Sequence, residues 1–232
     1  MDERRICAFV PARGGSQGVK GKNWRDLGGK PLILWTLEFA LSSNAISEVY
    51  LSSDSETIAH IGSSGKIGVE TFVDLPEDSI TELDKNFYFH RRRRDQAQTL
   101  SLISEVLFDF VKRNKLWERF DFLLLLQPTS PFRSEEEIDR LLDLLQTDGW
   151  SSIVSLKDIG GMHPDRMYKL EDGIATPFSD QSLGDNRPRQ SLEKLFIKDG
   201  AYYLLRIENL AREIMLGNRI LPFFREIGRA HV

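Results

Sequence analysis

A glycine-rich loop with basic residues follows the first apolar run of the chain. Residues 11–23 read PARGGSQGVKGKN, directly after the apolar segment ICAFV at 6–10. Glycines let main-chain N–H groups approach an anion closely, and successive N–H groups form a concave anion-binding surface. Arg13 and Lys22 would add positive charge where charge develops on a phosphoryl group. The loop therefore favours phosphate binding over a plain glycine turn with solvated lysines.

The spacing of this loop excludes two common phosphate-binding motifs. The nucleoside triphosphatase loop has four residues between its first glycine and a Gly-Lys pair, which Ser or Thr follows. Here five residues separate Gly15 from Gly21, and Asn23 follows Lys22. The dinucleotide motif Gly-x-Gly-x-x-Gly is absent from the sequence, which argues against a Rossmann oxidoreductase. Asn23 itself could hydrogen-bond a sugar hydroxyl or a phosphate oxygen.

A second polar turn follows the most apolar segment of the chain. The sequence FDFLLLLQPTSP at 120–131 begins as a strand of the kind found at the centre of a parallel sheet. Gln127 carries both a donor and an acceptor, Thr129 and Ser130 add hydroxyls, and two prolines stiffen the turn. Such a turn suits a polyhydroxylated substrate, and Ser134 is expected to cap the helix that follows it.

Strands and helices are expected to alternate along the chain and to position these two turns. The expected strands are 6–10, 48–54, 69–73, 120–126 and 151–157, and the expected helices are 31–44, 55–65, 99–114 and 134–149. This alternation predicts a three-layer α/β fold with a doubly wound, mostly parallel sheet. Ligands of such sheets bind at the carboxyl ends of the strands, where both turns would lie.

Composition limits the class of protein. The chain has 232 residues, 41% of them apolar, and a net charge of −4, which suggests neither a nucleic-acid nor a membrane-surface partner. Cys7 is the only cysteine, so no intrachain disulfide can form and a cytoplasmic location is expected. Cys7 itself is expected to be a buried structural residue. The histidines form no metal-binding pattern, and we predict no zinc site.

Residues 158–195 interrupt the alternating pattern. They contain glycines, prolines and scattered charge with weak periodicity, and the sheet is expected to resume at DGAYYLLR. We predict a single nucleotidyltransferase domain at 1–225, within which 158–195 forms a dimerisation or substrate arm. A long surface loop is the alternative interpretation of that segment.

Four segments, in this order, resemble the acylneuraminate cytidylyltransferase family: FVPARGGSQGVKGKN, LLQPTSPFR, HPDRMYKL and NRPRQSLEKLFIKDGAYYL. The resemblance extends from about Ile6 to about Phe224. It implies a fold of the nucleotide-diphospho-sugar transferase type. It also implies transfer of CMP from CTP to the anomeric hydroxyl of a nine-carbon α-keto acid sugar, with release of pyrophosphate, by a Mg²⁺-dependent homodimer.

The resemblance also implies roles for particular residues. Arg13 and Lys22 would act on the triphosphate as catalytic residues. The implied nucleotide contacts are Gly14, Gly15, Ser16, Asn23, Arg92 and Thr99, and the implied sugar contacts are Gln127, Thr129, Ser130 and Arg189. The arginine run 91–94 leaves the register of the nucleotide-binding arginine open, and a solvated basic patch is the alternative interpretation of that run.

Two departures from the family pattern affect the predicted site. Gln17 stands where the family mostly has lysine, although Lys20 is near. Ile197 stands where some members have an arginine, so the residues that bind the acidic group of the sugar stay open. The exact acid sugar therefore stays open among sialic, legionaminic and pseudaminic types. Two further alternatives are a cytidylyltransferase for an eight-carbon acid sugar and a non-catalytic sugar-nucleotide binding protein.

The last residues depart from the family as well. In the family an Asp-x-Asp that holds Mg²⁺ follows a segment like NRILPFF, whereas here no aspartate occurs after Asp199. The final residues EIGRAHV at 226–232 match a translated sequencing adapter, so we expect a non-native tail, with a genuine short tail as the alternative. On this expectation the metal-binding aspartates lie beyond the chain end, and the chain turns over poorly.

Overall fold

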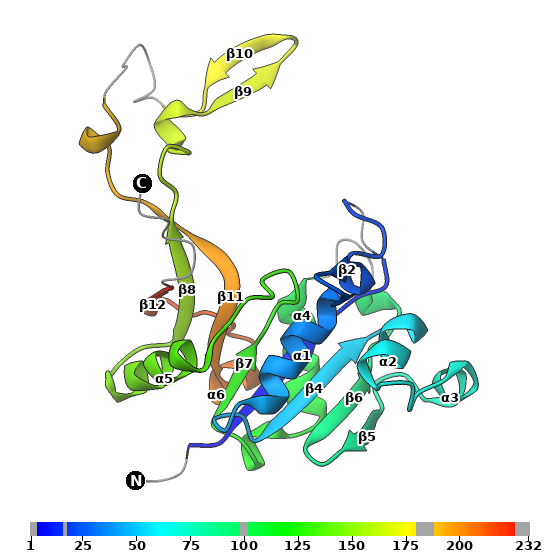
Figure 1. Ribbon diagram of the computed structural model, residues 1–232. Coiled ribbons are helices and arrows are strands. Elements are labelled where there is room, and N and C mark those ends of the chain that lie inside the picture. The colour runs from blue at the N-terminus through cyan, green and yellow to red at the C-terminus, as the bar shows by residue number, and fades with distance from the viewer. Residues whose placement is uncertain (1–3, 16–17, 98–101, 180–187, 226–232) are drawn as a thin grey trace. The chain divides into compact units, whose positions relative to one another are not determined.

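The computed structural model describes residues 4–15, 18–97, 102–179 and 188–225. The chain divides into two compact units. The first comprises 1–155 and 200–223, and the second comprises 156–199 and 224–232. Most of the sheet and the helices that cover it belong to the first unit (Figure 1).

One eight-stranded sheet organises the fold, with the strand order β12-β8-β11-β7-β1-β4-β6-β5. The strands are β1 Ile6–Pro11, β4 Glu48–Ser53, β5 Ile80–Asp84, β6 Phe87–Arg91, β7 Phe122–Leu125, β8 Ser152–Asp158, β11 Phe196–Arg206 and β12 Ile220–Phe224. The neighbours β7, β1, β4 and β6 run parallel, whereas β11 is antiparallel to β7 and β5 is antiparallel to β6. The predicted mostly parallel sheet is confirmed.

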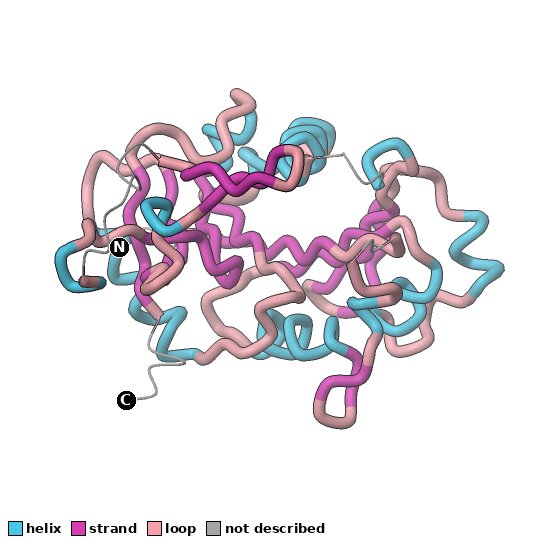
Figure 2. The backbone as a smooth tube through the Cα atoms, turned by 90° about the horizontal axis from the view of Figure 1, so that it is seen from above, coloured by secondary structure: helices cyan, strands magenta, loops and turns pink. Residues whose placement is uncertain are grey.

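Helices cover both faces of this sheet (Figure 2). They are α1 Leu32–Ser42, α2 Glu56–Gly62, α3 Val69–Asp74, α4 Ile103–Arg113, α5 Glu135–Asp143 and α6 Ile207–Ala211. Short 3₁₀ turns are η1 Lys22–Trp24, η2 Asp95–Ala97, η3 Leu116–Glu118, η4 Leu144–Gln146, η5 Pro164–Arg166 and η7 Arg189–Ser191. Among the described residues no helix is long and apolar enough to cross a membrane.

Strand β1 shows how the layers are held together. Its side chains alternate between the two faces of the sheet, so consecutive residues enter different layers. Ala8 belongs to the same buried cluster as Ile33 of α1. The ring of Phe9 packs instead on Phe110 of α4, with 4.8 Å between ring centroids. Cys7 is fully buried, as predicted, and burial raises the pKa of its thiol well above the ordinary value.

One expected strand is wrong. Residues 69–73 form helix α3, and the third parallel strand along the chain is β6. Phe72 is largely buried, whereas Val69 and Val73 on the same helix are exposed. One buried residue in a five-residue segment with three apolar side chains does not distinguish a strand from a short helix. Strand β6 escaped prediction because His90 and Arg91 make its second half look polar.

Other expected helices differ mainly at their ends. The helix expected at 134–149 ends as α5 at Asp143 and continues as the 3₁₀ turn η4. Ser134 caps α5 as predicted, because its side chain accepts a hydrogen bond from the Glu137 N–H. The helix expected from 99 is described from Ile103 onward as α4.

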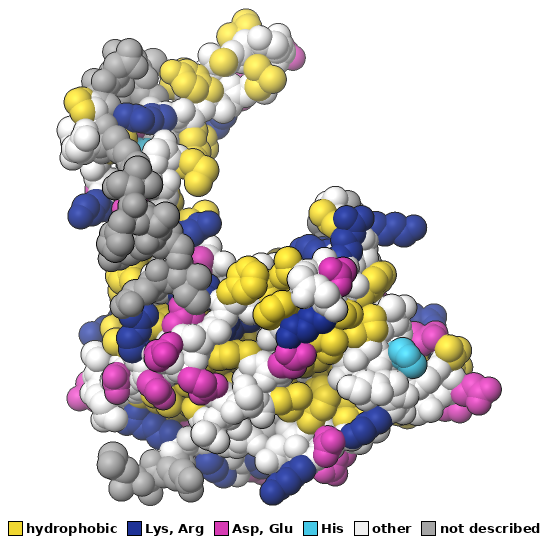
Figure 3. Space-filling model, viewed as in Figure 1, with side chains coloured by type: hydrophobic (Ala, Val, Ile, Leu, Met, Phe, Trp, Pro, Cys, Tyr) yellow, Lys and Arg dark blue, Asp and Glu magenta, His cyan; other side chains and the backbone are white. Residues whose placement is uncertain are grey.

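The second compact unit contains a small antiparallel hairpin of β9 Tyr168–Glu171 and β10 Ile174–Pro177. A minor pair, β2 Asp26–Leu27 and β3 Lys30–Pro31, lies in the first unit. Large apolar side chains are exposed on and beside the β9–β10 hairpin (Figure 3): Met167, Tyr168, Leu170, Ile174 and Phe178. The predicted arm at 158–195 falls within this unit, and its role in dimerisation stays a prediction.

Candidate active site

Three turns meet where the parallel strands β1, β4 and β6 end. Register pairs Pro11 with Ser52 and Ser52 with His90, so the carboxyl ends of the three strands are level. Main-chain hydrogen bonds extend this alignment beyond the strands. The Ala12 N–H donates to the Ser52 oxygen, and the Arg92 N–H donates to the Ser53 oxygen, each at 2.9 Å. The residues that follow each strand therefore share one edge of the sheet.

Asp54 anchors the glycine loop to this edge. The Gly14 N–H donates to Asp54 Oδ1 at 2.9 Å. A Cβ atom on Gly14 would lie 2.9 Å from the Cβ of Ser55, which is closer than real Cβ atoms approach. Glycine is therefore required at position 14 for packing, and its N–H is already bound to the protein. Gly15 is different, because it is exposed and a Cβ there would meet nothing within 4 Å.

Asn23 shapes the loop from its other end. Its side chain is buried, and Nδ2 donates to the Arg13 oxygen at 3.1 Å. This contact gives Asn23 a structural role, and its predicted contact with a nucleotide stays a prediction. Lys22 begins η1 immediately before Asn23 and is half-buried.

Arg92 is the buried member of the arginine run. It is 5% exposed, and it donates from Nε to Ser52 Oγ and from Nη2 to the Ser52 oxygen, each at 3.2 Å. Burial lowers the pKa of Arg92 to about 10; the Asp54 carboxylate opposes this change and the Arg13 charge adds to it. A fall from 12.5 to about 10 corresponds to roughly 3 kcal/mol against the charged form. An anion at this edge would offset that cost.

The other three arginines have different surroundings. Arg91 lies over the Phe72 ring, 4.8 Å from its centroid. Arg93 forms ion pairs with Asp95 and with Asp109 of α4. Arg94 has a side chain that is 86% exposed. The run is therefore neither a uniform solvated patch nor a set of equivalent residues. Arg92 is its buried member, and its predicted contact with a nucleotide stays a prediction.

Gln127 and Ser130 lie together at the end of β7, against the beginning of β11. A Cβ atom on Gly200 would lie 2.9 Å from Gln127 Oε1 and 3.3 Å from Ser130 Oγ. Gly200 also has φ of 82°, in the left-handed region that favours glycine. Both side chains are half-buried, whereas Thr129 is exposed.

Arg133 fixes this second turn, and sequence reasoning missed it as a functional candidate. Its guanidinium donates to the Gln127 oxygen at 2.8 Å, to the Ala201 oxygen at 3.1 Å and to Thr36 Oγ1 at 3.0 Å. It thus ties the turn after β7 to β11 and α1. The available signal was its position, since an arginine directly after a rigid turn can reach back to the carbonyl groups of that turn.

The predicted site residues are thus distributed unevenly. Arg13, Gly14 and Arg92 meet at the ends of β1, β4 and β6, and Gln127 and Ser130 lie at the end of β7 in the same sheet. Ser16 and Thr99 lie outside the described residues. Arg189 begins η7 in the second unit, and its side chain is outside the described part of the structure.

The described residues contain no dense cluster of metal-ligating side chains. Within them, no group of three or more His, Cys, Asp or Glu side chains could hold a metal ion. Mg²⁺ commonly binds through one or two carboxylates together with substrate phosphates, so the expected Mg²⁺ stays a prediction.

Comparison with known proteins relates the chain to the cytidylyltransferases. Residues 7–73, which include the glycine loop, match the family model described as Cytidylyltransferase. Over 159 residues the chain is 36% identical to CMP-N,N'-diacetyllegionaminic acid synthase of Legionella pneumophila, covering 67% of this chain and 59% of that protein. The chain is a relative of the acylneuraminate cytidylyltransferases.

A longer match supports the same relationship. The N-acylneuraminate cytidylyltransferase of Streptococcus agalactiae is 28% identical over 211 residues, which cover 90% of this chain and 45% of that protein. The chain thus spans about half the length of the curated relatives that it matches. The family resemblance predicted from the four sequence segments is confirmed.

The fold agrees with a solved cytidylyltransferase structure. A CMP:2-keto-3-deoxy-manno-octonic acid synthetase complexed with CTP superposes with a TM-score of 0.56 at 17% identity, covering 89% of this chain and 76% of that one. At this identity the likeness shows a shared fold and does not favour an eight-carbon substrate. The nucleotide-diphospho-sugar transferase type of fold, expected for a relative of the acylneuraminate cytidylyltransferases, is confirmed.

Proposed function

We propose that this protein transfers CMP from CTP to the anomeric hydroxyl of a nine-carbon α-keto acid sugar and releases pyrophosphate. The observation that carries the proposal is the placement of Arg13, Arg92 and the glycine loop at one carboxyl edge of the sheet. The depressed pKa of Arg92 favours an anionic ligand there, and the relationship to cytidylyltransferases makes a triphosphate the best candidate.

The reaction requires little covalent chemistry from the protein. The anomeric oxygen of the sugar bonds to the α-phosphorus of CTP, the bond from that phosphorus to the pyrophosphate oxygen breaks, and the hydroxyl proton passes to water. Catalysis of such a transfer consists mainly of positioning and charge stabilisation. Arg13, Lys22 and Arg92 would stabilise the negative charge that develops on the phosphate oxygens.

The turn after β7 would bind the sugar. The amide of Gln127 can both donate and accept, and the Ser130 hydroxyl lies beside it. Arg133 fixes the main chain of this turn, so that the sugar meets a preformed surface. Such preorganisation lowers the entropy that binding must overcome.

Mg²⁺, a homodimer and a cytoplasmic location belong to the same proposal. Mg²⁺ would neutralise phosphate charge, but none of the described residues is assigned to hold it. The exposed apolar side chains of the β9–β10 hairpin, among them Leu170 at 76% exposure, support contact with a second copy of the chain. Light scattering at micromolar concentration tests this: a dimer supports the proposed assembly, and a monomer rejects it.

The test of function is pyrophosphate release from CTP with Mg²⁺ and a panel of acid sugars. We expect release with one or more sugars of the sialic, legionaminic or pseudaminic type. Release of pyrophosphate only with an eight-carbon acid sugar would show that the substrate is of that class and not a nine-carbon sugar. Binding of CTP without release by any sugar would identify a non-catalytic nucleotide-binding protein.

A further inference from the structure

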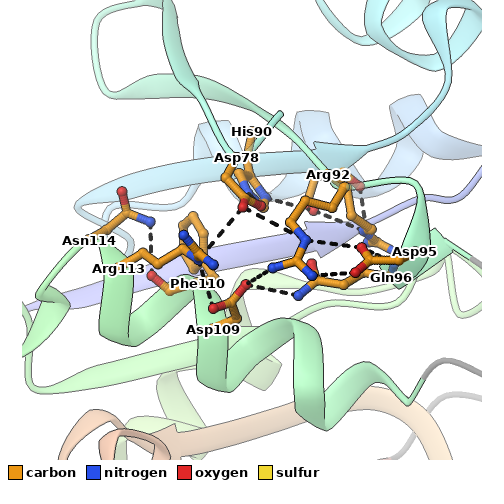
Figure 4. Close-up of polar contacts among 11 residues, drawn as sticks. Asp78, His90, Arg92, Asp95, Gln96, Asp109, Phe110, Arg113 and Asn114 are labelled. Atoms are coloured by element: carbon orange, nitrogen blue, oxygen red, sulfur yellow. Dashed lines mark hydrogen bonds and ion pairs between the residues drawn. The ribbon is translucent and has the colours of Figure 1, made fainter. Parts of the chain in front are cut away.

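A chain of buried polar contacts holds Arg92 at the ends of β4 and β6. Arg92 Nε and Nη2 donate to the side chain and main chain of Ser52. On the other side of Ser52, Oγ lies 3.0 Å from His90 Nδ1. His90 Nε2 in turn lies 3.8 Å from Asp78 Oδ1 (Figure 4). Ser52 and His90 are both buried, so this chain is shielded from water.

The available protons give the chain one direction. A guanidinium can only donate, so Ser52 Oγ accepts from Arg92 and keeps its single O–H for another partner. The Asp78 carboxylate can only accept, which favours the proton of His90 on Nε2. His90 Nδ1 is then an acceptor for the Ser52 O–H. The hydrogen bonds from Arg92 to Ser52 and from Ser52 to His90 thus run in one direction and strengthen each other, and the Asp78 carboxylate orients the ring electrostatically across 3.8 Å.

The far end of this chain is fixed by the main chain and by packing. Asp78 has φ of 63°, a left-handed backbone conformation that non-glycine residues adopt rarely. Its N–H donates to the Arg91 oxygen at 2.8 Å, which holds it beside the end of β6. The His90 ring packs near Phe9 and Phe110, with centroid distances of 6.3 and 4.9 Å. The imidazole therefore has little freedom to turn away from Ser52.

We propose that His90, acting through Ser52 and oriented by Asp78, is a positioning residue that presets the Arg92 guanidinium for the triphosphate. This inference rests on the proposed nucleotide site. A long arginine side chain loses rotamer entropy when it is held in one geometry, and a preset guanidinium has already lost it before the ligand arrives. A neutral imidazole does this without placing a second positive charge behind Arg92.

The electrostatic surroundings agree with a neutral ring. Burial lowers the pKa of His90, and the Arg92 charge lowers it further, whereas Asp78 and Asp109 act in the opposite direction. Arg93 and Arg113 compensate these two carboxylates, because both form ion pairs with Asp78 and with Asp109 (Figure 4). The carboxylates therefore do not suffice to charge the imidazole.

The test measures the affinity for CTP by calorimetric titration of the wild type and of matched variants. His90→Phe keeps an aromatic ring for Phe9 and Phe110 but removes both nitrogens, and we expect about tenfold weaker binding. His90→Asn keeps an acceptor near the position of Nδ1, and we expect no more than about threefold weaker binding. Arg94→Ala, in the same run but exposed, should bind as the wild type does. Thermal unfolding confirms that each variant is folded at the titration temperature.

A double-mutant cycle separates positioning from a general structural effect. Arg92→Met fills similar space without charge, and His90→Phe should have no further effect on affinity in that background. If Arg92→Met itself binds CTP like the wild type, the proposed nucleotide site is wrong, and the inference is overturned with it. If Arg92→Met weakens binding but His90→Phe does not, or if the two losses simply add, only the role of His90 is overturned.

Discussion

The main-chain N–H of Gly14 donates to Asp54 Oδ1 across 2.9 Å, and this bond joins the loop after β1 to the end of β4. Asp54 also opposes the fall in the pKa of Arg92. One carboxylate therefore connects the glycine loop with the buried arginine. This connection holds the first residues of the loop, 12–15, at the edge of the sheet, although the loop lacks a standard phosphate-binding spacing.

Gly14→Ala should destabilise the protein, because the new Cβ would lie 2.9 Å from Ser55 Cβ. We expect a loss of about 1–3 kcal/mol in the free energy of unfolding, measured by urea denaturation. Gly15→Ala is the matched control, since its Cβ would meet nothing within 4 Å, and its effect should stay within about 0.5 kcal/mol. Equal effects of the two substitutions would show that the packing against Ser55 does not constrain the loop.

Gly200→Ala should impair sugar binding in addition to its effect on stability. Gly200 and Gly173 have similar φ values of 82° and 79°, so alanine at either position should cost about 1 kcal/mol of backbone strain. Only at position 200 would the Cβ also displace Gln127 Oε1. We therefore expect the KM for the acid sugar to rise with Gly200→Ala and to stay unchanged with Gly173→Ala. A similar KM in both variants would remove Gln127 from the sugar site.

Lys22→Ala should reduce catalysis and leave the fold intact. The lost charge should cost roughly 2–4 kcal/mol of transition-state stabilisation, seen as a lower kcat/KM in pyrophosphate release. Lys85→Ala is the control, because Lys85 is exposed in the turn before the amino end of β6. Unchanged turnover of Lys22→Ala, in a preparation where the wild type is active, would contradict the proposed role.

The stability of the wild type should fall in acid partly because of His90. Its folded pKa lies below the ordinary value of 6.5, so the unfolded chain binds a proton at a pH where the folded chain does not. Stability therefore decreases as the pH falls below about 6.5 and is unaffected by this group at higher pH. Urea denaturation at pH 7.5 and 5.5 should show a smaller decrease for His90→Phe. Equal decreases would mean that His90 is not held neutral.

The sequence was sufficient to predict that the two polar turns follow strands of one parallel sheet. The buried run ICAFV and the run before Gln127 could only be central strands, and the polar turns after them had to share an edge of a parallel sheet. Local composition carried that information. The identity of the buried arginine did not follow in the same way, because it depends on how β6 pairs with β4.

Contacts over long separations account for what the sequence did not reveal. Ser52 and Arg92 are 40 residues apart, as are Gly14 and Asp54, and nothing in their local patterns pairs them. Arg133 contacts Ala201, 68 residues away, for the same reason. Helix α3 was mistaken for a strand because the segment VETFV is too short for its periodicity to decide between the two. Local patterns thus located the turns, whereas the sheet register determined their contacts.

Hydrogen exchange with and without CTP tests the location of the nucleotide most directly, because it requires binding but no turnover. We expect CTP to slow exchange in peptides that contain residues 12–15, 52–55 and 92–94, where the ends of β1, β4 and β6 meet. Peptides of the β9–β10 hairpin should show no such effect. Slower exchange confined to other parts of the chain, or no change at saturating CTP, would contradict a nucleotide site at this edge.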